Sequence, residues 1–112
     1  MPGKFELKKS GNGQFFFNLK AGNGQVILSS EQYSERRGAE GGIASVQKNA
    51  PDDGRYERKQ SSGGQSYFVL KATNGQTLGR SEMYTTAASM ENGIESVKKN
   101  APGAPTADLT AG

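Results

Sequence analysis

Chemistry in this chain would have to come from carboxylates, because the sequence contains neither histidine nor cysteine. That absence removes the commonest general base near neutral pH, the nucleophile–histidine systems and most transition-metal sites. Aspartate occurs only at Asp52, Asp53 and Asp108. Asp52 and Asp53 stand in a Pro-Asp-Asp-Gly stretch, which is typical of a solvated turn and lacks the spaced oxygen ligands of a calcium loop. We therefore predict no metal, no cofactor and no catalytic residue.

Two glutamate–tyrosine pairs are the remaining basis for an enzyme: Glu31 with Tyr33, and Glu82 with Tyr84. Each pair precedes a predicted helix, so the four side chains could form two equivalent polar pockets. The alternative is structural, because an acidic residue is favoured near a helix N-terminus and a tyrosine ring packs well on a helix end. We rank an enzyme using these pairs last among the functions considered.

A third group combines aromatic and basic side chains. Phe16 and Tyr67 fall on the predicted sheet face away from the helices, with Lys8 and Lys59 on the neighbouring strands. Such a surface could contact a protein partner. It could also stack single-stranded nucleic acid, or its aromatics could be covered by flanking residues.

These residues are placed by an internal repeat. Residues 5–51 align without a gap with residues 56–102. A repeat of this length is one supersecondary unit, and each copy alone is near the size at which burial becomes marginal. We expect one domain, 1–112, with repeat one at 4–53, repeat two at 54–102 and a tail at 103–112.

Each copy predicts three strands followed by a helix. Alternating or strand-forming segments are separated by Gly- and Asn-rich turns, and the Asn-Gly pairs suggest type I′ hairpins with positive φ at both central residues. The predicted strands are residues 5–8, 15–20 and 26–28 in the first copy, and 56–59, 67–71 and 77–80 in the second.

Helical spacing follows the third strand of each copy. The apolar stripe is Ala39, Ile43 and Val46 in the first copy and Ala87, Met90, Ile94 and Val97 in the second. Ser34 and Thr85 are the predicted N-caps, and Asn49 and Asn100 the predicted left-handed residues after the helices. Pro51 and Pro102 make continuation of either helix unfavourable.

Comparison of the two copies predicts the core. Phe17/Phe68, Leu19/Leu70 and Ile27/Leu78 stay apolar and should face the helices, whereas Leu28/Gly79 are placed on the opposite face. Gly42/Gly93 should let each helix approach the sheet closely. Gly38 and Gly41 are extra glycines in the first helix, which should therefore fray more easily. The tail is either disordered or supplies a closing strand at 106–110.

Composition limits the class of protein. The net charge is +3, which is too weak by itself to indicate a nucleic-acid footprint. No apolar N-terminal segment resembles a signal peptide, and no run is long enough to span a membrane. We expect a cytoplasmic protein with no membrane association, acting as a monomer because two repeats are already fused.

A combined motif comprises Leu19-Lys20-Ala21, Asn23-Gly24-Gln25, Ser30-Glu31-Gln32-Tyr33, the stretch 42–51 and the stretch 92–100. This motif resembles the YegP-like family, in its tandem-repeat form. The resemblance implies α+β architecture: β-β-β-α(-β) units merge into one antiparallel sheet with two helices on one face, a pseudo-twofold and exchanged C-terminal strands. It implies that residues 106–110 form the exchanged strand of the second unit and that the segment around Arg55 forms that of the first. It implies no activity.

Three functions follow, in order of preference. The first is a small non-catalytic binding or structural module with an unidentified protein partner. The second is weak binding of single-stranded nucleic acid through the sheet face opposite the helices, which we consider unlikely. The third is the glutamate–tyrosine enzyme.

Overall fold

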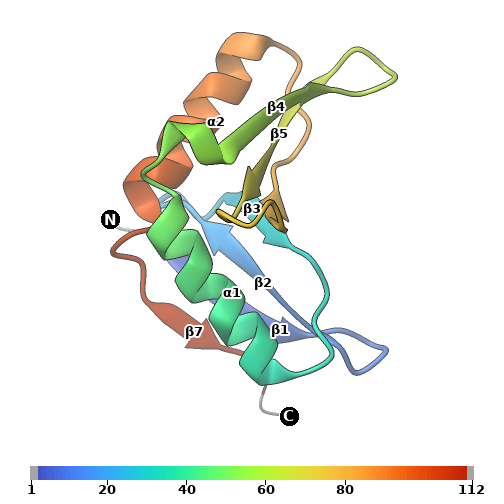
Figure 1. The fold of residues 1–112 in the computed structure, drawn as a ribbon, viewed down its shortest axis with the longest axis vertical. Helices are drawn as coiled ribbons and strands as arrows, with labels where there is room; N and C mark the ends of the chain where they lie inside the picture. Colours follow the sequence, from blue (N-terminus) through green and yellow to red (C-terminus); the bar gives the residue numbers. More distant parts are fainter. Residues whose placement is uncertain (1–2, 111–112) are drawn as a thin grey trace.

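A computed structural model describes residues 3–110 as two helices packed on one face of a single sheet (Figure 1). None of the described residues forms a helix long and apolar enough to cross a membrane. In chain order the elements are β1 Lys4–Lys9, β2 Phe15–Lys20, β3 Val26–Ser30, α1 Arg36–Asn49, the 3₁₀ turn η1 Asp53–Arg55, β4 Tyr56–Gln60, β5 Ser66–Lys71, β6 Thr77–Arg80, α2 Ala87–Asn100 and β7 Thr106–Asp108.

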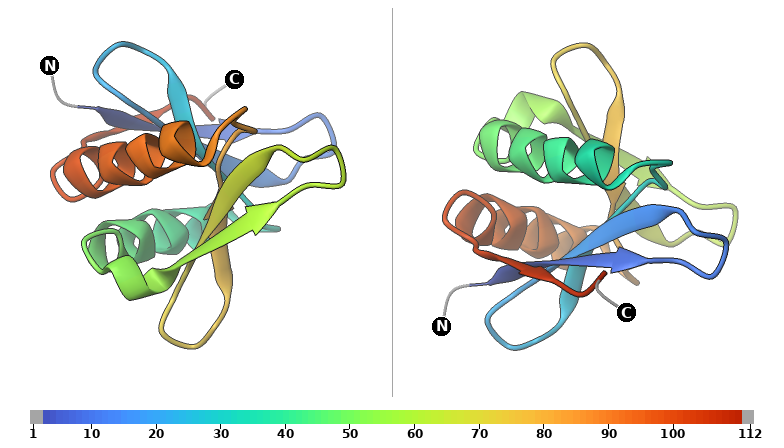
Figure 2. Two further views of the ribbon diagram at one scale, coloured as in Figure 1. Left: turned by 90° about the horizontal axis from the view of Figure 1, so that it is seen from above. Right: turned by 90° about the horizontal axis from the view of Figure 1, so that it is seen from below.

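The sheet has seven strands in the order β4-β5-β6-β3-β2-β1-β7. The first six strands read symmetrically, because β1, β2 and β3 occupy places that match β4, β5 and β6. The two halves meet through a short β3–β6 ladder, Ser29↔Arg80 and Ser30↔Gly79. Helices α1 and α2 lie side by side, with the twisted sheet passing around them (Figure 2). The predicted α+β fold is confirmed, and the pseudo-twofold stays an interpretation of this order.

The seventh strand makes the sheet mixed rather than wholly antiparallel. β7 lies beside β1 and runs parallel to it, pairing Phe5 with Thr106 and Leu7 with Asp108. The tail therefore contributes a strand to the first repeat, as expected for the second unit, although this strand covers residues 106–108 rather than 106–110. The same expectation for the segment around Arg55 is wrong: Asp53–Arg55 form a 3₁₀ turn that leads directly into β4.

The core lies between the sheet and the helix stripes. Phe5 packs edge-on against Phe17, and Tyr56 against Phe68, with ring centroids 5.9 and 5.7 Å apart. Ala87 is the exception in the predicted stripe, because it is the first residue of α2 and is exposed. The predicted stripe residues that are buried are Ala39, Ile43, Val46, Met90, Ile94 and Val97.

A register shift corrects the predicted sides of β3 and β6. The ladder slips between Leu19 and Lys20, so that Leu28 pairs with Leu19 on the helix face, where it is fully buried. The matching Gly79 faces the same way, and a Cβ there would lie 2.8 Å from the Cγ of Leu28. Leu28 therefore fills the space that Gly79 leaves, and Leu28/Gly79 do not belong to the opposite face. A single bulge is enough to invert the side chains beyond it.

The hairpin turns are also of a different type from the prediction. Within residues 3–110 no residue other than glycine has a positive φ, whereas Gly24 and Gly75 have φ of 85° and 86°. The Gly24 amide donates to the Ala21 carbonyl, and the Gln25 amide donates to Asn23 Oδ1. Each Asn-Gly pair therefore closes a type I turn followed by a left-handed glycine, not a type I′ turn.

The N-terminal and C-terminal ends of both helices differ from the predicted caps. The N-caps are Glu35 and Thr86, one residue later than predicted, and only the Thr86 side chain accepts an amide hydrogen bond, from Ser89. Asn49 is helical, and its side chain donates to the Ser45 carbonyl at 2.8 Å instead of entering the left-handed region. Asn100 bonds Ser96 in the same way.

Candidate functional site

The strand register separates a helix face of the sheet from an opposite face, which we call the outer face. Directly paired residues in neighbouring strands point to the same side. One row crosses the six antiparallel strands through Glu6, Asn18, Ser29, Arg80, Val69 and Glu57. With the flanking pairs, the outer face comprises Lys4, Glu6, Lys8, Phe16, Asn18, Lys20, Val26, Ser29, Glu57, Lys59, Tyr67, Val69, Lys71, Thr77 and Arg80.

The predicted aromatic–lysine group lies on this face but is divided in two. Lys8 pairs with Phe16, and Lys59 pairs with Tyr67. β2 and β5 are three strand spacings apart, about 14 Å. Because these strands run in opposite directions, Phe16 and Tyr67 lie on opposite sides of the central row, and both are half-buried. They form two separate corners rather than one aromatic platform.

The outer face concentrates basic charge. Of the fourteen basic residues in the chain, six lie on this face, together with only two of the eleven acidic ones. The rest of the molecule therefore carries eight basic and nine acidic residues. All of the net positive charge is accounted for by one side of the sheet. The basic members are Lys4, Lys8, Lys20, Lys59, Lys71 and Arg80.

Glu6 organises the lysines at one end of the face. Its side chain is 9% exposed, and its carboxylate lies 3.2 Å from the ammonium of Lys20 and 3.5 Å from those of Lys4 and Lys8. Burial acts to raise the pKa of Glu6, but the hydrogen bond from Lys20 and the three positive charges outweigh it and lower the pKa. The carboxylate thus stays ionised and holds three ammonium groups close together.

Glu57 has the same place in the second copy. Its carboxylate oxygens lie 3.0 Å from Lys59 and 3.0 Å from Lys71. Hydrogen bonds from these two lysines lower the pKa of Glu57. Each end of the outer face therefore carries a lysine cluster arranged around one carboxylate and bearing a net positive charge.

The predicted glutamate–tyrosine pairs are not brought together as a polar pocket. The ring of Tyr33 stacks on Phe17 with centroids 6.3 Å apart, and it packs against Gly38 and Gly42 of α1. Tyr84 packs against Gly93 of α2, which Phe68 also approaches. Burial, and then the neighbouring glutamate, raises the pKa of each tyrosine. Glu31 and Glu82 are exposed.

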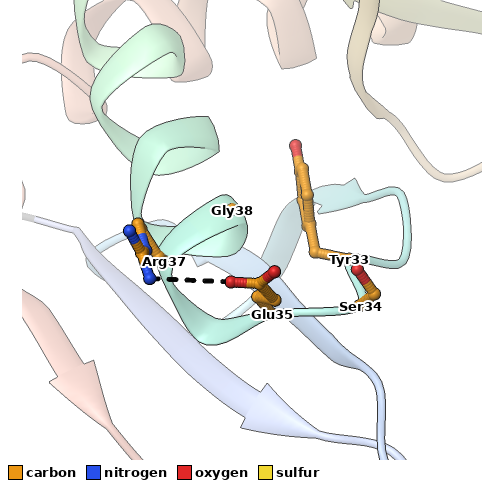
Figure 3. A pocket seen from close by; sticks show the side chains of 5 residues that line it. All are labelled: Tyr33, Ser34, Glu35, Arg37 and Gly38. Atoms are coloured by element: carbon orange, nitrogen blue, oxygen red, sulfur yellow. Dashed lines mark ion pairs between the residues drawn. The ribbon is translucent and has the colours of Figure 1, made fainter.

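A cavity of about 440 Å³ does open beside Tyr33, at the start of α1 (Figure 3). Its charged residues, Glu35 and Arg37, form an ion pair of 3.8 Å in which both side chains are largely exposed. The side chains drawn in Figure 3 do not converge on a common point, and the Tyr33 ring points away from the ion pair. No three acidic residues within residues 3–110 gather as a metal site would require.

The sequence indicated Lys8, Phe16, Lys59 and Tyr67 on the outer face but missed Arg80 at its centre. The bulges in the β2–β3 and β5–β6 ladders shift Ser29 and Arg80 onto this face. The repeat itself held a signal, because Ser29 aligns with Arg80 and the change adds a charge to only one copy.

Comparison with known proteins confirms the resemblance. A UPF0339 protein of Bordetella pertussis is 60% identical over 98% of both chains, and UPF0339 protein YegP of Escherichia coli K12 is 57% identical over 89% of this chain and 91% of its own. The solution structure of yegP from E. coli, described as a protein of unknown function, superimposes with a TM-score of 0.95 at 53% identity, covering 100% of this chain and 97% of that one. That of a UPF0339 protein from Shewanella oneidensis gives 0.93 at 49% identity, covering 98% and 93%.

The matching family model also occurs twice along the chain, with the same spacing between copies as the repeat in the sequence but with different bounds. That model, DUF1508, is described as a domain of unknown function, and it matches twice, at residues 10–57 and 61–108. Since the two matches span most of the chain and the relatives agree with them, the chain belongs to the DUF1508 family in its tandem form.

Proposed function

We propose that this chain is a non-catalytic binding module and that the outer face contacts an acidic surface of a protein partner. One observation carries the proposal: six basic and two acidic residues lie on this face, while the remainder of the chain is slightly acidic. One-sided charge steers an oppositely charged partner toward that side and favours it over others.

A protein surface suits the geometry better than a single nucleic-acid strand does. Stacking of successive bases needs neighbouring rings along a basic groove. Phe16 and Tyr67 are instead about 14 Å apart across the strands and stand on opposite sides of the central row. Phe16 with Lys8 and Tyr67 with Lys59 form two small, separate contact sites. A folded protein partner can contact both sites at once.

The non-catalytic part of the proposal rests on the chemical inventory. There is no histidine or cysteine, and the rings of Tyr33 and Tyr84 pack against helix glycines rather than facing Glu31 and Glu82 in a closed pocket. The same proposal includes a monomeric state, which is supported by the sharing of one sheet between the two repeats. A cytoplasmic location stays a prediction from the sequence.

Two triple variants with equal loss of charge test the proposal. Lys8→Ser/Lys59→Ser/Arg80→Ser removes three charges from the outer face. Arg37→Ser/Lys48→Ser/Lys99→Ser removes three from exposed helix positions and serves as the control. Fluorescence anisotropy would follow binding of a labelled poly-glutamate peptide and of a labelled oligo(dT) strand across a salt series.

The outer-face variant should lose binding of the poly-glutamate peptide at low salt, whereas the control variant should keep it. Equal losses in both variants would show that only net charge matters and would refute a defined contact face. Tighter, steeply salt-dependent binding of oligo(dT) that also needs the outer face would favour the nucleic-acid alternative.

A further inference from the structure

The two edges of the sheet differ, because an additional strand pairs with one of them and not with the other. At the β1 edge, the Phe5 amide donates to the Pro105 carbonyl and the Leu109 amide to the Leu7 carbonyl, each at 2.8 Å. β7 therefore covers this edge. At the opposite edge, β4 pairs only with β5 among the described residues, so one side of its backbone has no neighbouring strand. An uncovered edge is a template for pairing with another chain.

At one aligned position on the two edge strands, one repeat has an apolar residue and the other a charged residue. Leu7 of β1 aligns with Arg58 of β4, and both point to the helix side, since Leu7 pairs with Phe17 and Arg58 with Phe68. Leu7 is 1% exposed, whereas the side chain of Arg58 is 35% exposed. The covered edge thus carries a buried leucine where the uncovered edge carries an arginine that points inward.

A cluster of ion pairs holds Arg58 in place. Its guanidinium contacts both carboxylate oxygens of Glu91 on α2, at 2.6 and 3.0 Å, and Asp53 Oδ1 at 2.9 Å. Lys98, also on α2, reaches the same Asp53 oxygen at 2.7 Å and Glu95 at 3.2 Å. The cluster spans the turn before β4, β4 itself and the helix above it.

Most of this cluster is specific to the second copy. The first copy has Leu7, Ala44 and Gln47 where the second has Arg58, Glu95 and Lys98. In the first copy, Gln47 instead donates to the Ala104 carbonyl, on the segment that leads into β7. At these positions the first copy therefore holds the segment before β7, whereas the second copy carries mutually paired charges.

We propose that the cluster of Asp53, Arg58, Glu91 and Lys98 guards the β4 edge and prevents a second copy of this chain from pairing with it. A strand added beside β4 would cover the cluster and take its charges out of water, which is costly for ions. Inward-pointing charges on an edge strand are a known means of blocking such pairing. The backbone groups on the unpaired edge of β4 thus stay solvated, although β4 has the same place in its repeat as the covered β1.

The test replaces Arg58 by the residue that its counterpart carries. Arg58→Leu should form a concentration-dependent dimer, measured by light scattering after size-exclusion chromatography, while the unchanged chain stays monomeric over the same range. Hydrogen exchange should show slower exchange of the Arg58-position and Gln60 amides in the variant dimer, because these groups face the open edge.

Arg37→Leu is the matched control, because it makes the same chemical change at a side chain that is 90% exposed on α1. It should stay monomeric. Circular dichroism checks the fold, and Arg58→Met, which keeps a long unbranched stem, replaces Arg58→Leu if the latter unfolds. A monomeric Arg58→Leu or Arg58→Met, or dimerisation without protection of the β4 amides, would overturn the proposal, as would equal dimerisation of Arg37→Leu.

Discussion

At the scale of single residues, two glycines that look alike in the sequence have opposite roles. Gly41 and Gly42 are neighbours in α1. A Cβ on Gly41 would meet no atom within 4 Å, whereas one on Gly42 would collide with the Tyr33 hydroxyl and lie 2.9 Å from Phe17. Gly42 is therefore required by the ring that packs on the helix, and Gly41 is not.

Gly41→Ala should stabilise the protein by about 0.5–1 kcal/mol, because glycine is a poor helix former and the site has room. Gly42→Ala should destabilise it by about 1–3 kcal/mol, because the methyl group overpacks a buried contact. Urea unfolding of the two variants measures both values. Effects of the same sign would contradict the packing of Tyr33 described above.

Two ion pairs hold the pKa of Asp53 well below the ordinary value of an aspartate carboxyl. Hydrogen bonds from Arg58 and then from Lys98 lower the pKa of Asp53 to about 2. Because the folded pKa lies below the ordinary value of about 4, the stabilisation is complete above pH 4 and is lost as the pH falls through about 2.

Carboxyl-carbon NMR should show Asp53 titrating near pH 2 in the unchanged chain. In Arg58→Leu the pKa should rise but remain below the ordinary value, since Lys98 still contacts the carboxylate. Arg55→Leu is the control, because Arg55 pairs with Asp52 instead. An Asp53 pKa that does not respond to Arg58→Leu would remove Arg58 as its cause.

At the scale of elements, the two helices have the same length but different support at their starts. Thr86 accepts an amide hydrogen bond from Ser89 at 3.1 Å, whereas the matching Glu35 makes no such bond. The first turn of α1 also contains Gly38, where α2 has Ser89. Both differences favour fraying of α1 over α2, as the extra glycines predicted.

Glu35→Thr should stabilise the protein by about 1 kcal/mol, because it restores the capping hydroxyl of the second copy. The reverse change, Thr86→Glu, should cost a similar amount. Thermal unfolding measures the two shifts, and hydrogen exchange should localise the first to the start of α1. No change in exchange there would mean that the cap does not limit fraying.

At the scale of the whole molecule, the repeats complete each other. The β3–β6 ladder has only two pairs, so the halves are also joined by helices that reach across: α1 contacts β5 and β6, and α2 contacts β3. β7 adds a connection between the chain's end and its first strand, at the lower edge of Figure 1. Loss of β7 should therefore affect the first repeat, although β7 follows the second.

Deletion of residues 106–112 should lower the free energy of unfolding by about 2 kcal/mol, since backbone hydrogen bonds to β1 are worth about 1 kcal/mol each. The Leu7 amide should exchange faster. The shortened chain should also self-associate, because the β1 edge it exposes carries a leucine and no guard. Deletion of residues 111–112 alone is the control, and unchanged Leu7 exchange in the longer deletion would contradict the role of β7.

Most of the fold could be predicted from the sequence, because strand alternation, helical spacing and turn residues are local patterns. The error on the sides of β3 and β6 comes from dependence on a neighbouring strand. Leu28 was placed on the wrong face because a bulge against Lys20 shifts the register. The positions of Asn23 and Asn49 were correct, but their conformations were not, since each side chain found a backbone partner that composition does not reveal.

The candidate site was predicted only in part for the same reason. Lys8, Phe16, Lys59 and Tyr67 were assigned to the correct face from the alternation of single strands. Their division into two corners depends on the order of strands across the sheet, which no segment encodes by itself.

The sequence by itself determined the repeat, its strand and helix order, most of its core and the absence of histidine and cysteine. Those features depend on residues near one another in the chain or on comparison of two copies. Only the tertiary structure decided the parallel β7, the basic outer face and the charges that shield β4. The physical reason is that each arises where segments far apart in sequence meet, as when Asp108 joins Leu7 or Glu91 joins Arg58.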